Sequence, residues 1–163
     1  MAGVFKSWSG AVNTTAAPTR IATGTAIKTL LQLTAPSAKA ITIVSWSISF
    51  DGVTASAVPV PCELIETTTV AGGSPTAVTP IKWGGTTQAD ASAATVGFAP
   101  SSEGSVTGTT RLLDYVDLTP NGGVYVRDFP LGREPVVAAA QVVRIRTTSA
   151  ATVNAYASIS WEE

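Results

Sequence analysis

Residues 40–51 read AITIVSWSISFD, and this stretch alternates between large apolar and small polar side chains. Two sets of side chains lie on opposite sides of an extended chain, the apolar set Val44, Trp46, Ile48 and Phe50 and the serine set Ser45, Ser47 and Ser49. A period of two residues is typical of a strand with one face on a core, whereas a helix would scatter the same residues around its circumference. We therefore predict a central strand of a sheet here.

The same pattern returns at the end of the chain, in residues 153–161. Val153, Ile159 and Trp161 are expected to face inward, and the residues between them to face outward. About eight such short segments, separated by Gly and Pro turns, and no helical periodicity indicate an all-β chain. With 163 residues, we expect one domain, an antiparallel β-sandwich of jelly-roll-like form.

The chain divides into two parts by pattern. Residues 1–19 have neither strand nor helix periodicity but contain two isolated aromatics, Phe5 and Trp8, so we predict an N-terminal arm that docks either on its own domain or on a neighbour. Residues 20–163 form the predicted sandwich, with an irregular loop near 84–104. Trp83 and Phe98 flank this loop and either plug the core or form an adhesive patch.

Two short links are typical of hairpin turns. The first, around Ala35-Pro36-Ser37, separates the strand expected from residue 21 to residue 34 from the central strand. The second, Thr119-Pro120-Asn121-Gly122-Gly123, lies between two segments with β character. We expect an antiparallel hairpin at each link.

Composition excludes several classes of partner. Only 13% of the residues are charged, against about 25% in typical soluble domains, and the formal net charge is −1. We therefore expect no nucleic-acid binding, and with no long apolar run or leader-like N-terminus we expect neither a membrane span nor secretion. A surface so poor in charge suits a chain packed against other chains or an extracellular sandwich.

Residues able to carry out catalysis are scarce. The sequence has no histidine, which removes the usual triads and metal sites, and its single cysteine, Cys62, reads as a small buried hydrophobe. Carboxylates three apart, such as Glu63 with Glu66 and Asp114 with Asp117, point to opposite faces of a strand and do not form a catalytic pair. We expect no enzyme, no cofactor and no metal, and are left with a structural module or a sugar-binding sandwich that uses exposed aromatics such as Trp83.

Five stretches carry a resemblance to a known class of protein. They are IKTLLQL from Ile27, WSISFDG from Trp46, ELIET from Glu63, LGREPV from Leu131, and VNAYASISWEE from Val153. Together they resemble small virion structural proteins of tailed phages that infect actinobacteria. None of these motifs is catalytic, so the resemblance brings no catalytic residues with it.

The resemblance implies a capsid decoration (cement) protein that binds the major capsid protein lattice on the head surface, after assembly in the host cytoplasm. Homotrimers over threefold positions are the oligomer it suggests. We expect Phe5, Trp8, Trp83 and Phe98 to be interface residues, and removal of residues 1–17 to weaken particle binding without unfolding the domain. The alternative is a tail or receptor-binding sandwich that binds host-surface carbohydrate.

Overall fold

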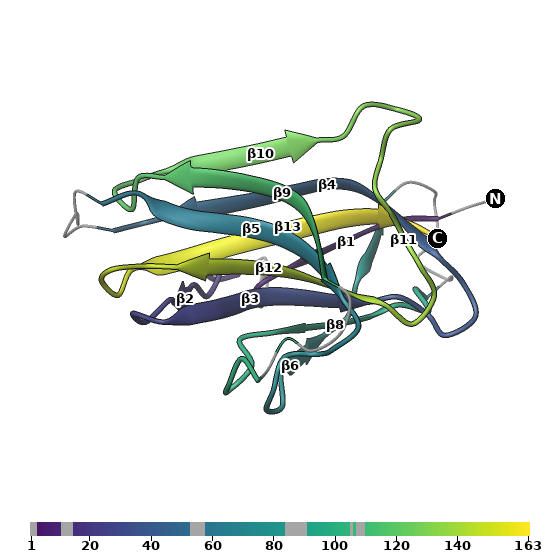
Figure 1. Cartoon of the computed structure of the whole chain (residues 1–163), viewed down its shortest axis with the longest axis horizontal. Helices are drawn as coiled ribbons and strands as arrows, with labels where there is room; N and C mark the ends of the chain where they lie inside the picture. Colours follow the sequence, from purple (N-terminus) through teal and green to yellow (C-terminus); the bar gives the residue numbers. More distant parts are fainter. Residues whose placement is uncertain (1–2, 11–14, 53–57, 84–90, 105, 107–109) are drawn as a thin grey trace.

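The structure, a computed structural model, describes residues 3–10, 15–52, 58–83, 91–104, 106 and 110–163, and all regular structure within them is β (Figure 1). The strands are β1 (Val4–Trp8), β2 (Ile21–Ala22), β3 (Ile27–Thr34), β4 (Ile41–Phe50), β5 (Val60–Thr67), β6 (Thr76–Val78), β7 (Ile81–Trp83), β8 (Thr95–Phe98), β9 (Thr110–Leu118), β10 (Val124–Asp128), β11 (Val136–Val137), β12 (Val142–Thr148) and β13 (Asn154–Glu162).

These strands form two antiparallel sheets packed face to face. The seven-stranded sheet has the order β10-β4-β13-β1-β7, with β11 also paired to β4 and β2 to β13. The six-stranded sheet has the order β6-β8-β3-β12-β5-β9. The prediction of a single-domain antiparallel β-sandwich is confirmed.

The central strand predicted at residues 40–51 is β4, but its alternation is interrupted. On β13, Ser160 pairs with Ser45 and Trp161 with Ile43, so Val44 is an extra residue in β4 and forms a bulge. A bulge reverses which side chains face inward beyond it. The expectation that Val44 faces the core is therefore wrong, and Ile41 and Ile43 are buried instead.

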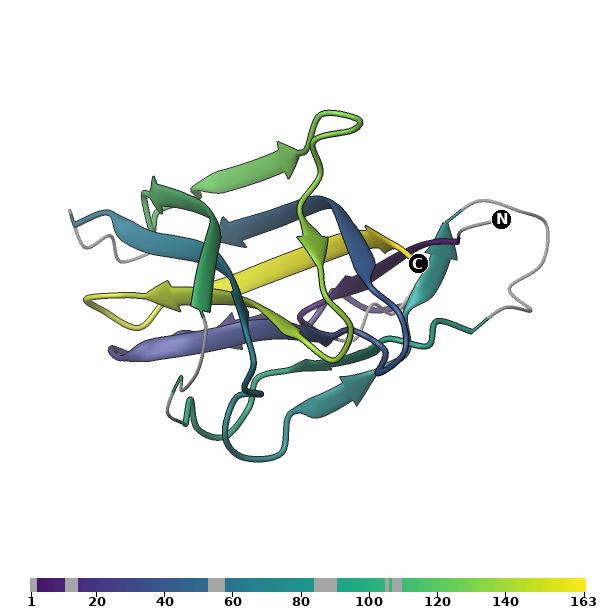
Figure 2. The ribbon, with the colours of Figure 1, turned by 45° about the vertical axis from the view of Figure 1, so that its right-hand side comes forward.

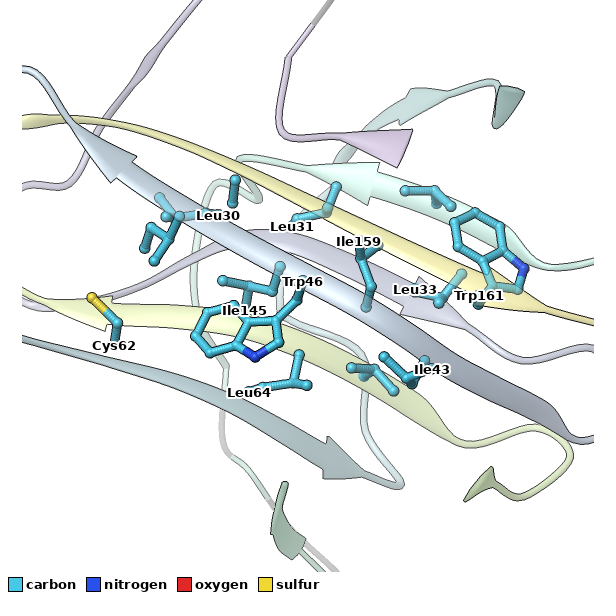
Figure 3. Packing of buried hydrophobic residues seen from close by; sticks show 14 of the residues in the cluster. Leu30, Leu31, Leu33, Ile43, Trp46, Cys62, Leu64, Ile145, Ile159 and Trp161 are labelled. Atoms are coloured by element: carbon cyan, nitrogen blue, oxygen red, sulfur yellow. The ribbon is translucent and has the colours of Figure 1, made fainter. Parts of the chain in front are cut away.

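The core lies between the inner faces of the two sheets (Figure 3). Its largest side chains, Trp46 and Trp161, come from β4 and β13, and both are fully buried. The opposite sheet contributes Leu33 from β3, Leu64 from β5 and Ile145 from β12. Burial of each large aliphatic side chain stabilises the fold by about 1.5–3 kcal/mol, so this single core accounts for the cohesion of the two sheets.

The N-terminal segment is not an arm at residues 4–8. These residues form β1, which pairs with β13 on one side and with β7 on the other (Figure 2). Phe5 is 4% exposed and stacks on Trp161 with ring centroids 6.0 Å apart. Residues 4–8 therefore dock on their own domain rather than on a neighbour. Removing residues 1–17 would uncover Trp161 and break the ladder, so we expect this truncation to destabilise the domain as well as to weaken particle binding.

Both predicted hairpins are wrong, although both turns are present. β3 lies in the six-stranded sheet and β4 in the seven-stranded sheet, and β9 and β10 are divided in the same way. In the second turn, Gly122 has a φ of 71°, and a Cβ on Gly123 would lie 2.2 Å from the carbonyl oxygen of Thr119. These glycines allow the reversal, but the apolar faces of the flanking strands approach the core from opposite sides, so the chain crosses between sheets.

The loop predicted near 84–104 contains one strand of the six-stranded sheet. β8 pairs with β3 and β6, so this part of the prediction is wrong, and Val96 of β8 is buried in the core. Residues 84–90 lie outside the described residues.

Candidate functional site

A groove of about 340 Å³ lies on the outer face of the seven-stranded sheet. Its floor is formed by four serines from the two adjacent central strands: Ser45 and Ser47 on β4, Ser158 and Ser160 on β13. They lie there because the alternation that places Trp46, Ile48 and Ile159 in the core places the intervening serines on the opposite side.

The serine floor is only partly hydrogen-bonded. Ser47 and Ser158 are paired across the two strands, and their Oγ atoms are 2.7 Å apart. Ser160 is 2% exposed, and its Oγ has no hydrogen-bond partner among the described residues. A buried hydroxyl without a hydrogen-bond partner lowers the stability of the fold by about 1–3 kcal/mol. The Ser160 hydroxyl therefore keeps an unused capacity to donate and to accept a hydrogen bond.

One wall of the groove is aromatic and cationic. Trp83 of β7 is 57% exposed, and Lys6 of β1 lies beside it with Nζ 4.9 Å from the centroid of the Trp83 ring. The same Nζ is 5.6 Å from the ring of Trp8. This cation–π arrangement holds the lysine along the edge of the groove. The opposite wall is β10, which contributes Val126, 62% exposed, and Asp128.

The four predicted interface residues have different locations. Trp83 is exposed and Trp8 is half-buried, and both lie on the outer face of the seven-stranded sheet, in contact with Lys6. Phe5 is buried against Trp161, and Phe98 is half-buried and packed against the core. The structure therefore brings two of the four together on one surface and places the other two inside the domain.

The carboxylates three residues apart on β5 have separate structural partners. Glu66 forms an ion pair with Arg111, with Oε2 2.6 Å from Nη2, whereas Glu63 pairs with Arg146. Within the described ranges, no group of three or more acidic or cysteine side chains is placed to hold a metal ion.

Asp114 joins the two sheets at their edge. Its Oδ2 accepts hydrogen bonds from Trp46 Nε1 at 2.9 Å and from the Tyr125 hydroxyl at 3.0 Å. Burial, followed by the hydrogen bond to Asp114, raises the pKa of Tyr125. Asp117, three residues on, instead accepts a bond from the surface hydroxyl of Tyr115. The prediction that these two carboxylates face apart agrees with these contacts.

Cys62 lies in the core on β5 and is fully buried. Burial raises the pKa of its thiol from 9.0 to about 12, with a smaller opposing effect from the hydrogen bond with Thr147. A thiol with this pKa carries almost no thiolate near neutral pH. Its position agrees with the interpretation as a small buried hydrophobe.

The outer face of the six-stranded sheet is closed by loops of the same chain. Arg144 of β12 is fully buried there and donates hydrogen bonds to the backbone carbonyls of Thr69 and Glu103. The Glu103 carboxylate in turn accepts a bond from Thr29 Oγ1 at 2.7 Å, and Gln32 Oε1 accepts one from the backbone amide of Ala71 at 3.0 Å. Burial lowers the pKa of Arg144, an effect partly offset by Glu103. These contacts bind two loops to the sheet.

A second exposed surface, which the sequence did not indicate, follows the outer edge of the seven-stranded sheet. We call it the β10–β11 edge and define it by four exposed apolar residues: Val124, Val126, Leu131 and Val136. Leu131 is 97% exposed and lies in the turn between β10 and β11, next to Gly132 with a φ of 79°. A leucine followed by Gly132 in a turn was the available signal, because turns rarely bury a large side chain.

Comparisons with protein-family models, with curated proteins and with solved structures found no match for this chain. Within the described residues, no helix is long and apolar enough to cross a membrane.

Proposed function

We propose that this chain is a structural virion protein, a capsid decoration (cement) protein that binds the major capsid protein lattice without covalent bonds. The observation that carries the proposal is the β10–β11 edge, where Leu131 is 97% exposed and Val124, Val126 and Val136 are all more than half exposed. Large apolar side chains exposed in a row along one edge of a sheet are candidates for a surface that another protein covers. The choice of the capsid as the partner comes from the resemblance of the five stretches to small virion proteins.

The connectivity of the strands supports the same interpretation. From β3 to β5, and again from β9 through β10 and β12 to β13, successive long strands alternate between the two sheets, and the first strand of the chain lies beside the last. We infer from this alternation that the sandwich is a jelly roll, an architecture found among viral capsid proteins and lectins.

The proposed mechanism is adhesion by repetition. Each subunit contributes a modest interface through its β10–β11 edge, and binding of many subunits to a repeating lattice sums these contacts. A homotrimer over threefold positions is the proposed oligomer, and the capsid surface the proposed location.

The test mixes purified protein with particles that lack it and locates the added density by electron microscopy. We expect regular density over the head lattice for the native chain and at least a tenfold loss of occupancy for Leu131→Asp. Val70→Asp is the matched control, because Val70 is 55% exposed on a loop over the opposite sheet. Density on the tail alone would refute the decoration role, and equal occupancy for both variants would refute the β10–β11 edge as the contact surface.

The second candidate function is a tail or receptor-binding module that binds host-surface carbohydrate. One observation favours it, the groove with its serine floor and exposed Trp83.

A further inference from the structure

The groove has three features that folding does not require. Ser160 Oγ is buried without a partner among the described residues, Trp83 is more than half exposed, and Lys6 is held against that tryptophan rather than extended into solvent. All three belong to different strands, β13, β7 and β1, and all line the same hollow. Their convergence points to a ligand.

We propose that this groove binds a neutral pyranose residue of a glycan, with Trp83 stacking on the apolar face of the sugar ring and the serine floor hydrogen-bonding to its hydroxyls. This inference rests on the second candidate function and gives it a site and a ligand class. It does not depend on the decoration role, although the groove and the β10–β11 edge share Val126.

The chemistry of the floor matches an array of hydroxyls. A serine hydroxyl donates one hydrogen bond and accepts up to two, as a sugar hydroxyl does. Ser47 and Ser158 already share one bond and keep capacity for another, and Ser160 has its full capacity unused among the described contacts. The Ser160 Oγ is covered, so a sugar hydroxyl reaches it only when a side chain of the groove moves aside, and the contact would then satisfy both hydroxyls at once.

The walls supply the apolar contact and the charge balance. Pyranose rings have one face rich in C–H groups, and the exposed indole of Trp83 presents a large apolar surface at the rim of the groove. Lys6 and Asp128 lie on opposite walls and carry opposite charges. The two charges balance across the groove, so a neutral saccharide fits it better than a polyanion.

The groove suits a small ligand better than a protein strand. Its floor consists of β4 and β13, whose backbone groups are already paired with neighbouring strands on both sides, so no strand can add there. Its volume of about 340 Å³ is near the lower end of the range of about 300–1,000 Å³ for small-molecule sites. A single sugar residue of a longer glycan is the occupant of matching size and polarity.

The test is titration calorimetry of the full chain with four neutral probes, the tetrasaccharides of glucose, galactose, mannose and N-acetylglucosamine. We expect at least one probe to bind, and to shift the backbone amide NMR signals of the four floor serines. Trp83→Ala should weaken binding at least tenfold and Ser160→Ala three- to tenfold, with the melting temperature of each variant unchanged.

Leu131→Asp is the control, because it lies on the β10–β11 edge outside the groove and should leave glycan binding unchanged. Particle occupancy is measured on the same variants, so loss of glycan binding and loss of capsid binding are separated. Binding of none of the four probes, equal binding by the native chain and Trp83→Ala, or self-association through the groove in sedimentation would each overturn the proposal.

Discussion

The outer faces of the two sheets differ in what covers them. On the six-stranded sheet, the chain folds its own loops over the strands and holds them with Arg144, which is fully buried although it points away from the core. On the seven-stranded sheet, the corresponding surface keeps a serine-floored groove open between Trp83 and β10. One polar surface is closed by many intramolecular contacts, and the other keeps a hydroxyl without a partner in the described structure.

This difference separates the polar residues that stabilise the fold from those that do not. Arg144, Glu103, Thr29 and Gln32 bond to one another or to loop backbone, so their loss should lower stability. Ser160 contributes no such bond, so its loss should affect binding alone. Changes at Arg144 and Ser160 test this contrast directly, and changes at Phe5 and Cys62 compare the core with the open surface.

The largest effect is expected at Arg144. Arg144→Ala leaves Glu103 without its buried counter-charge and the two loops without their main anchor, so we expect the free energy of unfolding to fall by about 3–5 kcal/mol. Denaturant titration followed by tryptophan fluorescence measures it. Arg146→Ala, next but one on the same strand and partly exposed, is the control and should cost only about 1 kcal/mol. Equal losses at both positions would show that closure of this face contributes little.

The next effect compares the two sides of β1. Phe5→Ala opens a cavity beside Trp161 and should lower the free energy of unfolding by about 3 kcal/mol. Trp8→Ala, on the outer side of the same strand, should cost less than about 1 kcal/mol. Thermal unfolding of both variants measures the two losses. An unchanged melting temperature for Phe5→Ala would mean that the packing of β1 contributes little to stability.

A third effect compares the interior with the open surface by thiol labelling. Below pH 9, native Cys62 should react with iodoacetamide at least about a hundredfold more slowly than a cysteine placed at Val126 in a Cys62→Ala background. Burial raises the pKa of the folded Cys62 thiol from 9.0 to about 12. The contribution of the buried, protonated thiol to the free energy of unfolding is therefore complete below pH 9 and is lost as the pH rises towards 12. Similar labelling rates for the two thiols would contradict the burial of Cys62.

The smallest effect is expected at Ser160. Ser160→Ala removes a hydroxyl without a partner among the described residues, so the free energy of unfolding should change by less than about 0.5 kcal/mol, or rise slightly. Ser9→Ala is the control, because Ser9 Oγ accepts a bond from the Ala157 amide at 2.7 Å and its loss should cost about 1 kcal/mol. A large loss at Ser160 would assign it to the fold rather than to a ligand.

Local sequence patterns predict where the strands lie better than they predict which strands pair with one another. Alternation located β4 and β13 correctly, because a period of two needs no knowledge of distant residues. It failed at Val44, because a bulge depends on the register with β13, more than a hundred residues further along the chain. The turn at Thr119 was recognised from its glycines, but turn residues do not specify which sheet the next strand joins.

The candidate site was predicted only in part. The sequence leaves Trp83 open between a plug of the core and an adhesive residue, and only the structure shows that it is exposed. The serines of β4 and β13 are expected from the alternation to face outward, and they form the floor of the groove. Their assembly with Lys6 could not be foreseen, because β1 has too few residues to show a period and its place between β13 and β7 is set by pairing at both edges. Arg144 was missed for a related reason, since the loops that bury it come from residues 41 and 75 positions earlier in the chain.

The position of β13 has a consequence for the order in which the molecule forms. β13 lies between β4 and β1, so neither strand has its neighbour on that side until residues 154–162 have left the ribosome. Strand pairs so distant in sequence form slowly, because a long loop must close before any contact rewards it. We therefore expect the seven-stranded sheet to close only after residues 154–162 have been synthesised, so that the groove and the β10–β11 edge become available to their partners only once β13 is in place.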